Sequence, residues 1–237
     1  PPDQGPMPPG GSGPARISLV IDDLGRSVEE VRHLEDLGVA ISYAVLPFES
    51  QTPQVVDELR HRGREILCHL PMEPRSAANP GPGALKTSMS PRELGRRTRE
   101  ALAAVPGAIG VNNHMGSSLT EDRARMASIL EELKERRLFF LDSRTSAQSV
   151  GYEVAQELGV PSAERQVFLD RDPSPEAIRE QFERLLALAR KRGAAIAIGH
   201  PYPSTLAALA ELIPASRAQG YEFVPVSFLL ESSGAPE

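Results

Sequence analysis

The sequence predicts an α/β fold built on about seven or eight parallel strands, and three observations lead to this prediction. Short apolar runs alternate with helical patterns along nearly the whole chain. Several helical patterns begin at a Ser and end at a Gly, as helices often do. Polar residues directly follow most of the apolar runs. In a parallel β/α fold, barrel or open sheet, these strand ends meet on one rim, where ligands bind.

The predicted strands are the apolar runs, which are short enough for strands and too short for most helices. In chain order they are 17–21, 41–46, 65–70, 108–111, 138–141, 166–169, 194–198 and 223–229.

The predicted helices lie between most of these strands. Ser27 with Glu30, and Ser90 with Glu93, have the spacing of a capping box. Residues 71–89 form a long loop, and loops of that length are usually functional or mobile. The helical patterns are 27–38, 52–63, 90–105, 120–137, 174–193 and 204–220.

The composition is that of a soluble globular domain with a sizeable core: 40% of the 237 residues are hydrophobic and 24% are charged. A net charge of −6 argues against nucleic acid as the main partner. The single cysteine, Cys68, excludes an intramolecular disulfide and a cysteine-type zinc site. No apolar run approaches the ~18 residues of a membrane span.

Residues 1–14 are mostly Pro, Gly and polar residues, and they are expected to form a disordered linker. Residues 15–237 are expected to form a single domain. A linker of this kind often joins a domain to an upstream element, and a membrane anchor is one candidate for it.

Six predicted strands carry polar residues at or just after their ends, and three of the five histidines are among them. Each group has an ordinary alternative explanation. The Asp pair could cap a helix, the first histidine could be a core residue, and Asp170 and Asp172 look like a local ion pair with Arg171. The groups are Asp22-Asp23, His69 with Glu73, Asn112-Asn113-His114, Asp142-Ser143-Arg144, Asp170-Arg171-Asp172 and His200.

Two carboxylates and three imidazoles on one rim suit a divalent metal of the zinc class, with three protein ligands and an open position. Such a metal polarises a carbonyl and lowers the pKa of bound water. A remaining carboxylate can then act as a base, and a remaining histidine as an acid.

Six motifs in this order resemble the divergent polysaccharide deacetylases, an offshoot of the carbohydrate esterases that remove N-acetyl groups from chitin and peptidoglycan. The resemblance covers about residues 16–230. It implies an irregular parallel (β/α) barrel of about seven strands and an extracytoplasmic location in bacteria, periplasmic or in the cell envelope. The motifs are VIDDLG, CHLPMEP, GVNNHMGSS, LDSRTS, VFLDRD and AIGHPYP.

The resemblance also implies roles for individual residues. Asp22 matches the general base and Asp23 a metal ligand. His69 matches the first of two metal-binding histidines, but Glu73 stands at the second position. The arginine-proline motif of the main family is replaced by NNHMG, and His200 matches the histidine that acts as the acid.

His114 is expected to supply the third ligand in place of the missing histidine. Glu73 is expected to be a reserve ligand or to orient a histidine, and Asn113 to orient a ligand or a substrate carbonyl. Asp142 is expected to raise the pKa of His200, and Arg144 to contact substrate or support the site. Zinc is the expected metal.

Three functions follow from these observations. The first is a metal-dependent hydrolase that removes N- or O-acetyl groups from a cell-envelope polysaccharide such as a peptidoglycan-like glycan. The second is a weakly active or inactive domain of the same fold that binds a glycan or an envelope protein. The third is a metal-free glycosidase that pairs Asp22 or Asp23 with Asp142.

Overall fold

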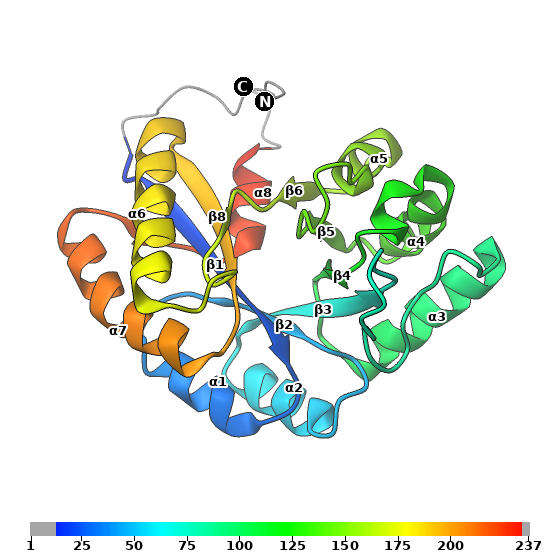
Figure 1. Ribbon diagram of the computed structural model, residues 1–237, viewed down its shortest axis with the longest axis horizontal. Coiled ribbons are helices and arrows are strands. Elements are labelled where there is room, and N and C mark those ends of the chain that lie inside the picture. Colours follow the sequence, from blue (N-terminus) through cyan, green and yellow to red (C-terminus); the bar gives the residue numbers. More distant parts are fainter. Residues whose placement is uncertain (1–12, 234–237) are drawn as a thin grey trace.

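A computed structural model describes residues 13–233, which form a curved sheet with helices along its outer face (Figure 1). The expected linker, residues 1–14, lies almost wholly outside the described residues. The strands are β1 (Arg16–Leu24), β2 (Ser42–Val45), β3 (Glu65–Met72), β4 (Gly110–Met115), β5 (Phe139–Asp142), β6 (Ser162–Glu164), β7 (Val167–Phe168), β8 (Ala194–Gly199) and β9 (Glu222–Phe223).

Helices connect most successive strands, so the predicted β/α alternation is confirmed. Ser27 and Ser90 both cap helices with their side-chain oxygens, as expected. The helices are α1 (Val28–Glu35), α2 (Thr52–His61), α3 (Pro91–Ala104), α4 (Arg123–Glu135), α5 (Gly151–Leu158), α6 (Pro175–Arg192), α7 (Pro203–Ala218) and α8 (Val226–Ser233), with a short 3-10 turn, η1 (Leu119–Glu121).

The strand pairs are all parallel, in the order β6-β5-β4-β3-β2-β1-β8-β7, and β9 adds to β1. The sheet curls into a barrel that stays open between β6 and β7, which pair with β5 and β8 respectively. The prediction of an irregular parallel barrel is therefore confirmed.

The opening is spanned by the side chain of Arg165, which lies between β6 and β7 in the sequence. Its guanidinium donates hydrogen bonds to the backbone oxygens of Ser143 (2.7 Å) and Arg144 (3.0 Å), just after β5. It also lies over the ring of Phe168, 4.8 Å from the ring centroid. One side chain thus links the two ends of the sheet.

The concave side of the sheet is filled by α8, which lies between β8 and β6 in Figure 1. Val226 and Leu229 of α8 pack against inward-facing residues of the strands, including Val20 and Leu67. The remaining apolar residues form a second, larger core between the sheet and the outer helices.

The prediction of a strand over residues 223–229 is wrong. β9 covers only Glu222–Phe223, and α8 begins at Val226. Pro225 has no N–H for a sheet ladder. The next backbone N–H, that of Val226, is instead donated to the Glu65 carboxylate (2.9 Å) and the Ser42 hydroxyl (3.0 Å), which cap the helix.

The fourth strand is also displaced from its predicted position. It runs over Gly110–Met115 rather than 108–111. Asn112, Asn113 and His114 therefore lie inside β4, opposite residues 69–71 of β3, rather than in a turn after it. Within residues 13–233, no helix combines the length and apolarity needed to cross a membrane.

Glu65 holds α8 in the barrel through its hydrogen bonds to the Val226 N–H and to the Ser42 hydroxyl (2.6 Å). We expect Glu65→Ala to lower the free energy of unfolding by about 1–2 kcal/mol, because a helix cap and a partly buried hydrogen bond are lost. Urea denaturation measures the change. The matched control is Glu131→Ala on the exposed face of α4, expected to change stability by less than ~0.5 kcal/mol. Equal effects would contradict the capping role.

Candidate metal centre

The inner face of the sheet changes from apolar to polar at the carboxyl ends of the strands. Side chains alternate between the two faces of a strand, so a residue two positions beyond an inner core residue faces inward as well. The rim of the barrel is built in this way on several strands. The apolar and polar partners are Val20 and Asp22 on β1, Leu67 and His69 on β3, and Ile198 and His200 at the end of β8.

Asp23 reaches the same rim although it directly follows Asp22. The register of β1 against β2 shifts between Ile21 and Leu24. Asp23 itself has φ 61°, in the left-handed region that Asp tolerates better than most residues. A bulge of this kind redirects a side chain at the end of a strand. Both carboxylates of the Asp pair therefore face the rim.

Asp23, His69 and His114 bring three ligand atoms together. Asp23 Oδ1 lies 2.8 Å from His114 Nδ1 and 3.2 Å from His69 Nε2. The two ring nitrogens are 3.1 Å apart. The structure thus places the three predicted metal ligands, from β1, β3 and β4, in one cluster.

This cluster fits a divalent cation by three criteria. Asp23 Oδ1 is buried and accepts no well-oriented hydrogen bond from the described residues, which is costly unless a cation satisfies it. Two imidazoles and a carboxylate are a ligand set of zinc-class ions. Ligands bound at ~2.0–2.2 Å to one ion would lie roughly 3–3.5 Å apart, close to the separations observed here.

Asn112 sets the orientation of two groups in the centre, and it was not among the predicted site residues. Its Oδ1 accepts a hydrogen bond from His69 Nδ1 (2.9 Å), which leaves the lone pair of Nε2 facing the cluster. Its Nδ2 donates to Asp22 Oδ1 (2.8 Å) and, at 3.3 Å, to Ser143 Oγ. Asn112 could have been predicted from its two-residue spacing from His114, because side chains two residues apart in a strand face the same side. This spacing has that meaning only when both residues lie within one strand, as they do in β4.

The two aspartates have opposite electrostatic environments. Burial raises the pKa of Asp23, but contacts with His114 and His69 outweigh this effect and hold the pKa below its usual range, which keeps Asp23 ionised. Burial dominates at Asp22 and raises its pKa, although His69 and His200 act in the opposite direction. Asp22 Oδ2 lies 3.5 Å from His69 Nε2, beside the cluster.

His200 is held by Asp170, which the sequence interpretation had assigned to a local ion pair. His200 Nδ1 lies 2.9 Å from Asp170 Oδ1. Asp170 Oδ2 accepts hydrogen bonds from the His200 backbone N–H (2.6 Å) and the Thr205 hydroxyl (2.8 Å). Burial alone would lower the pKa of His200, but the hydrogen bond and charge of Asp170, together with Asp22 and Asp23, raise it.

Asp142 does not lie beside His200 as the sequence suggested. Its carboxylate accepts hydrogen bonds from the Arg144 N–H (2.8 Å), the Ser149 hydroxyl (2.6 Å) and the Tyr152 N–H (3.1 Å). Asp142 therefore organises the connection from β5 to α5. This placement gives no support to a glycosidase that pairs Asp142 with the carboxylates of β1.

The Arg144 side chain serves the same connection, since its guanidinium donates to the backbone oxygens of Ser149 (3.0 Å) and Ala147 (3.2 Å). Asn113 links β4 to the residues after β5, accepting from the Ser143 N–H (2.9 Å) and donating to the Met115 oxygen (2.8 Å). Neither side chain contacts the cluster; both hold the loops around it.

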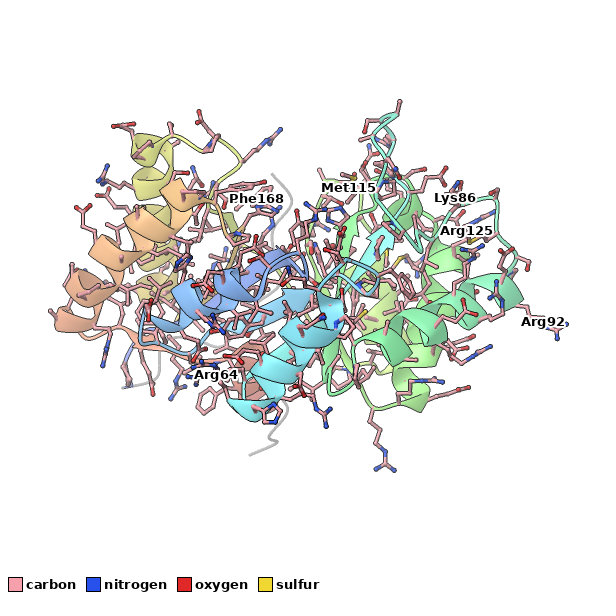
Figure 2. The ribbon with its side chains drawn as sticks, turned by 90° about the horizontal axis from the view of Figure 1, so that it is seen from below. Arg64, Lys86, Arg92, Met115, Arg125 and Phe168 are labelled. Carbon is pink, nitrogen blue, oxygen red and sulfur yellow. The ribbon has the colours of Figure 1, made fainter. Side chains whose placement is uncertain are left out.

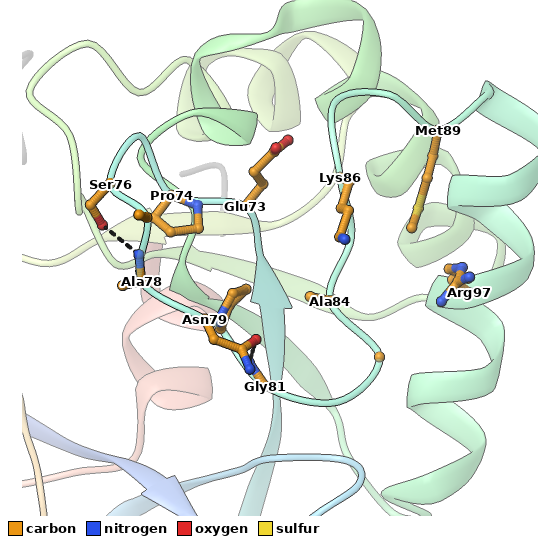
Figure 3. Close-up of a pocket in the computed structure, with 13 residues that line it drawn as sticks. Glu73, Pro74, Ser76, Ala78, Asn79, Gly81, Ala84, Lys86, Met89 and Arg97 are labelled. Atoms are coloured by element: carbon orange, nitrogen blue, oxygen red, sulfur yellow. Dashed lines mark hydrogen bonds between the residues drawn. The ribbon is translucent and has the colours of Figure 1, made fainter.

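Glu73 lies outside the cluster of ligand atoms. Its carboxylate accepts hydrogen bonds from the backbone N–H and the hydroxyl of Thr87, both at 2.6 Å. Glu73 lines a pocket of about 480 Å³. Figure 3 shows this pocket between the loop after β3 and α3. Lys86 and Arg97 line the same pocket. Glu73 thus belongs to this loop rather than to the metal centre.

Comparisons with known proteins identify the family of the chain. A family model described as divergent polysaccharide deacetylase matches residues 19–230. A crystal structure of the uncharacterized protein ATU2773 from Agrobacterium tumefaciens C58 is 25% identical with a TM-score of 0.87, covering 94% of this chain and 92% of that one.

Two curated relatives are named as uncharacterized proteins. One, from Haemophilus influenzae, is 40% identical over 195 residues, which cover 82% of this chain and 70% of that protein. The other, YibQ of Escherichia coli, is 37% identical over 198 residues, which cover 84% of this chain and 62% of that protein. Both relatives therefore have further sequence outside the matched region.

The geometry predicts which substitutions lower metal affinity. We expect His114→Ala to weaken zinc binding by more than ~10-fold, because only two of three protein ligands remain. Elemental analysis and competition with a chelator measure the effect.

Two variants serve as controls for this prediction. His61→Ala removes an exposed histidine of α2, and Glu73→Ala removes a carboxylate held by Thr87. Both should bind zinc as the parent protein does. A loss in Glu73→Ala equal to that in His114→Ala would contradict the assignment of the three ligands.

Proposed function

The chain belongs to the divergent polysaccharide deacetylase family, and from this premise we propose that it is a metal-dependent hydrolase that removes N- or O-acetyl groups from a cell-envelope polysaccharide. One observation carries the proposal: the cluster of Asp23, His69 and His114 lies between a buried carboxylate, Asp22, and an imidazole, His200. This arrangement supplies a cation site, a base and an acid within one rim.

A divalent cation in this cluster would supply a Lewis acid that polarises the acetyl carbonyl and acidifies a water molecule. Asp22 would remove a proton from that water. Asp22 Oδ1 already accepts a hydrogen bond from Asn112. The other oxygen of Asp22, Oδ2, lies on the side of His69 and is the oxygen available as the base. Asn112 also prevents the carboxylate from rotating, so the base keeps one position.

His200 would protonate the leaving group. Asp170 holds the proton on Nδ1 and stabilises the imidazolium form of the ring. Nε2 then faces the centre, 3.8 Å from Asp23 Oδ2. A proton on Nε2 can pass to the departing sugar nitrogen, or to the sugar oxygen of an O-acetyl group, as the bond to the acetyl carbon breaks.

The family supplies the class of substrate and the expected location. An acetylated polysaccharide, such as a peptidoglycan-like glycan, is the proposed substrate, and the periplasm or cell envelope is the proposed location. Zinc is the proposed metal, because the ligand set of one carboxylate and two imidazoles suits it.

In the second candidate function, the chain has the same fold and metal site but does not turn over substrate, and it binds a glycan or an envelope protein. Glu73 favours it, because this residue stands where the main family has a ligand and its carboxylate is held away from the cluster. Acetate release separates the two functions. Protein loaded with zinc, cobalt or manganese that releases no acetate from chitin oligomers or peptidoglycan would favour the binding function instead.

Asp22→Asn tests the base. The amide oxygen can still accept from Asn112, so we expect the fold and zinc content to stay, while kcat falls by at least ~10²–10⁴-fold because the basic oxygen is lost. Acetate release and elemental analysis are measured on the same sample. Asp57→Asn, on the exposed face of α2, is the matched control and should keep full activity. Turnover by Asp22→Asn at the rate of this control would rule out Asp22 as the base.

His200→Ala and Asp170→Asn test the acid. We expect His200→Ala to lower kcat by ~10²–10⁴-fold with zinc retained. Asp170→Asn should lower kcat by a smaller factor, because the imidazole remains but loses the charge that orients and protonates it. If Asp170→Asn left the rate unchanged while His200→Ala lowered it, Asp170 would have no part in the proton transfer.

A further inference from the structure

We propose that Tyr202 is a stacking platform for a sugar ring beside His200, so that a polysaccharide binds with the apolar face of one pyranose ring against the tyrosine. This inference rests on the proposed function, since it names how the same site holds its substrate. It assigns a binding role to a residue that the reaction chemistry itself does not use.

The Tyr202 ring has one covered face and one accessible side. It stacks on the His200 imidazole with 5.1 Å between ring centroids and an interplanar angle of 22°. The residue is nevertheless 43% exposed. Tyr43 and Tyr221, in contrast, are buried. A flat aromatic surface is therefore open to solvent directly beside the proposed acid.

The platform is rigid. Tyr202 lies between Pro201 and Pro203, with φ −70° and ψ 144°, and directly precedes α7. The two proline rings restrict the backbone on both sides of the tyrosine. Binding against such a ring costs little conformational entropy, which is why fixed tyrosines are effective in recognition sites.

One further ring contacts His200. The centroid of the Phe168 ring lies 5.5 Å from that of His200, and the Arg165 guanidinium lies over the Phe168 ring. His200 is itself fixed by Asp170. In Figure 2, Phe168 at the end of β7 is labelled just left of the middle of the molecule, and Met115 at the end of β4 just right of it. The rings of Phe168, His200 and Tyr202 thus lie together on the β7–β8 side of the rim.

The other large hydrophobic side chains that are exposed in the described structure do not offer such a surface beside the centre. The Phe48 ring packs against Gly83 in the loop after β3, so closely that a Cβ atom on Gly83 would lie only 2.3 Å from the ring. Ile109 precedes β4, and Phe228 lies on α8 under Arg16, so both are at the opposite end of the strands.

The chemistry of the tyrosine matches a sugar. The C–H groups of a pyranose form an apolar patch that an aromatic face can cover, and the hydroxyl groups around its edge need hydrogen-bond partners. Burial, Asp23 and Asp170 raise the pKa of Tyr202, so the ring stays uncharged at neutral pH, which suits packing against an apolar sugar face.

The test uses zinc-loaded protein carrying Asp22→Asn, so that the probe, an N-acetylglucosamine tetramer, is bound without turnover. Calorimetry measures Kd. We expect Tyr202→Ala and Tyr202→Leu to raise Kd roughly 10-fold, which corresponds to losing the apolar contact of one ring face. The Kd of Tyr202→Phe and of the control Phe48→Ala should stay within about twofold of the Kd of the parent protein, which carries Asp22→Asn alone.

A spectroscopic signature separates direct stacking from a general structural effect. The chain has four tyrosines and no tryptophan, so tyrosine dominates its near-ultraviolet absorbance. We expect the tetramer to produce a tyrosine difference spectrum in the parent protein. Tyr202→Phe should keep the affinity but lose this signal.

The outcomes separate the platform from the deacetylase proposal. Equal Kd for Tyr202→Ala, Tyr202→Leu and the parent protein overturns the platform, and the deacetylase proposal stands. A difference spectrum that persists in Tyr202→Phe also overturns it. Absence of tetramer binding to the parent protein overturns the platform as well, and acetate release from peptidoglycan then decides the deacetylase proposal separately.

Discussion

The two-residue period of the β-strand is the constraint on which the candidate site depends. In the lower part of the barrel, inward positions such as Val20 and Leu67 are apolar and pack against α8. Two positions further along, the same faces carry Asp22 and His69. The apolar layer excludes water beneath the polar one, so charges at the rim interact through a medium less polar than water. One geometric rule thus provides both the rigid support and the reactive groups.

Within that frame, the Asn112 amide couples the base to the metal ligands. It accepts from His69 and donates to Asp22, so the two side chains cannot reorient independently. A carboxylate at this position could accept from the imidazole but could not donate to Asp22, and it would add a third negative charge beside Asp22 and Asp23. A neutral side chain with both a donor and an acceptor satisfies both neighbours, which explains why an amide suits this buried position.

The alternation of apolar runs and helical patterns was sufficient for a parallel β/α fold with polar strand ends on one rim, because parallel topology brings neighbouring strand ends together whatever the details of the loops. The family resemblance supplied the barrel and the choice of Asp23, His69 and His114. Sequence reasoning was insufficient where the local sequence offered a plausible alternative explanation. Asp170 looked like a member of a local ion pair, but its partner is His200, thirty residues away. The helix that starts at Val226 was missed because its cap comes from β2 and β3, which no local pattern reveals.

The opening between β6 and β7 has a consequence for self-association. An open sheet has two free edges, and free edges can recruit a strand from another molecule. Here the edge strands are only three and two residues long, so they present few unpaired backbone groups. The Arg165 guanidinium places a positive charge at this opening and already binds backbone oxygens there. The barrel can remain unclosed without offering a template for edge-to-edge aggregation.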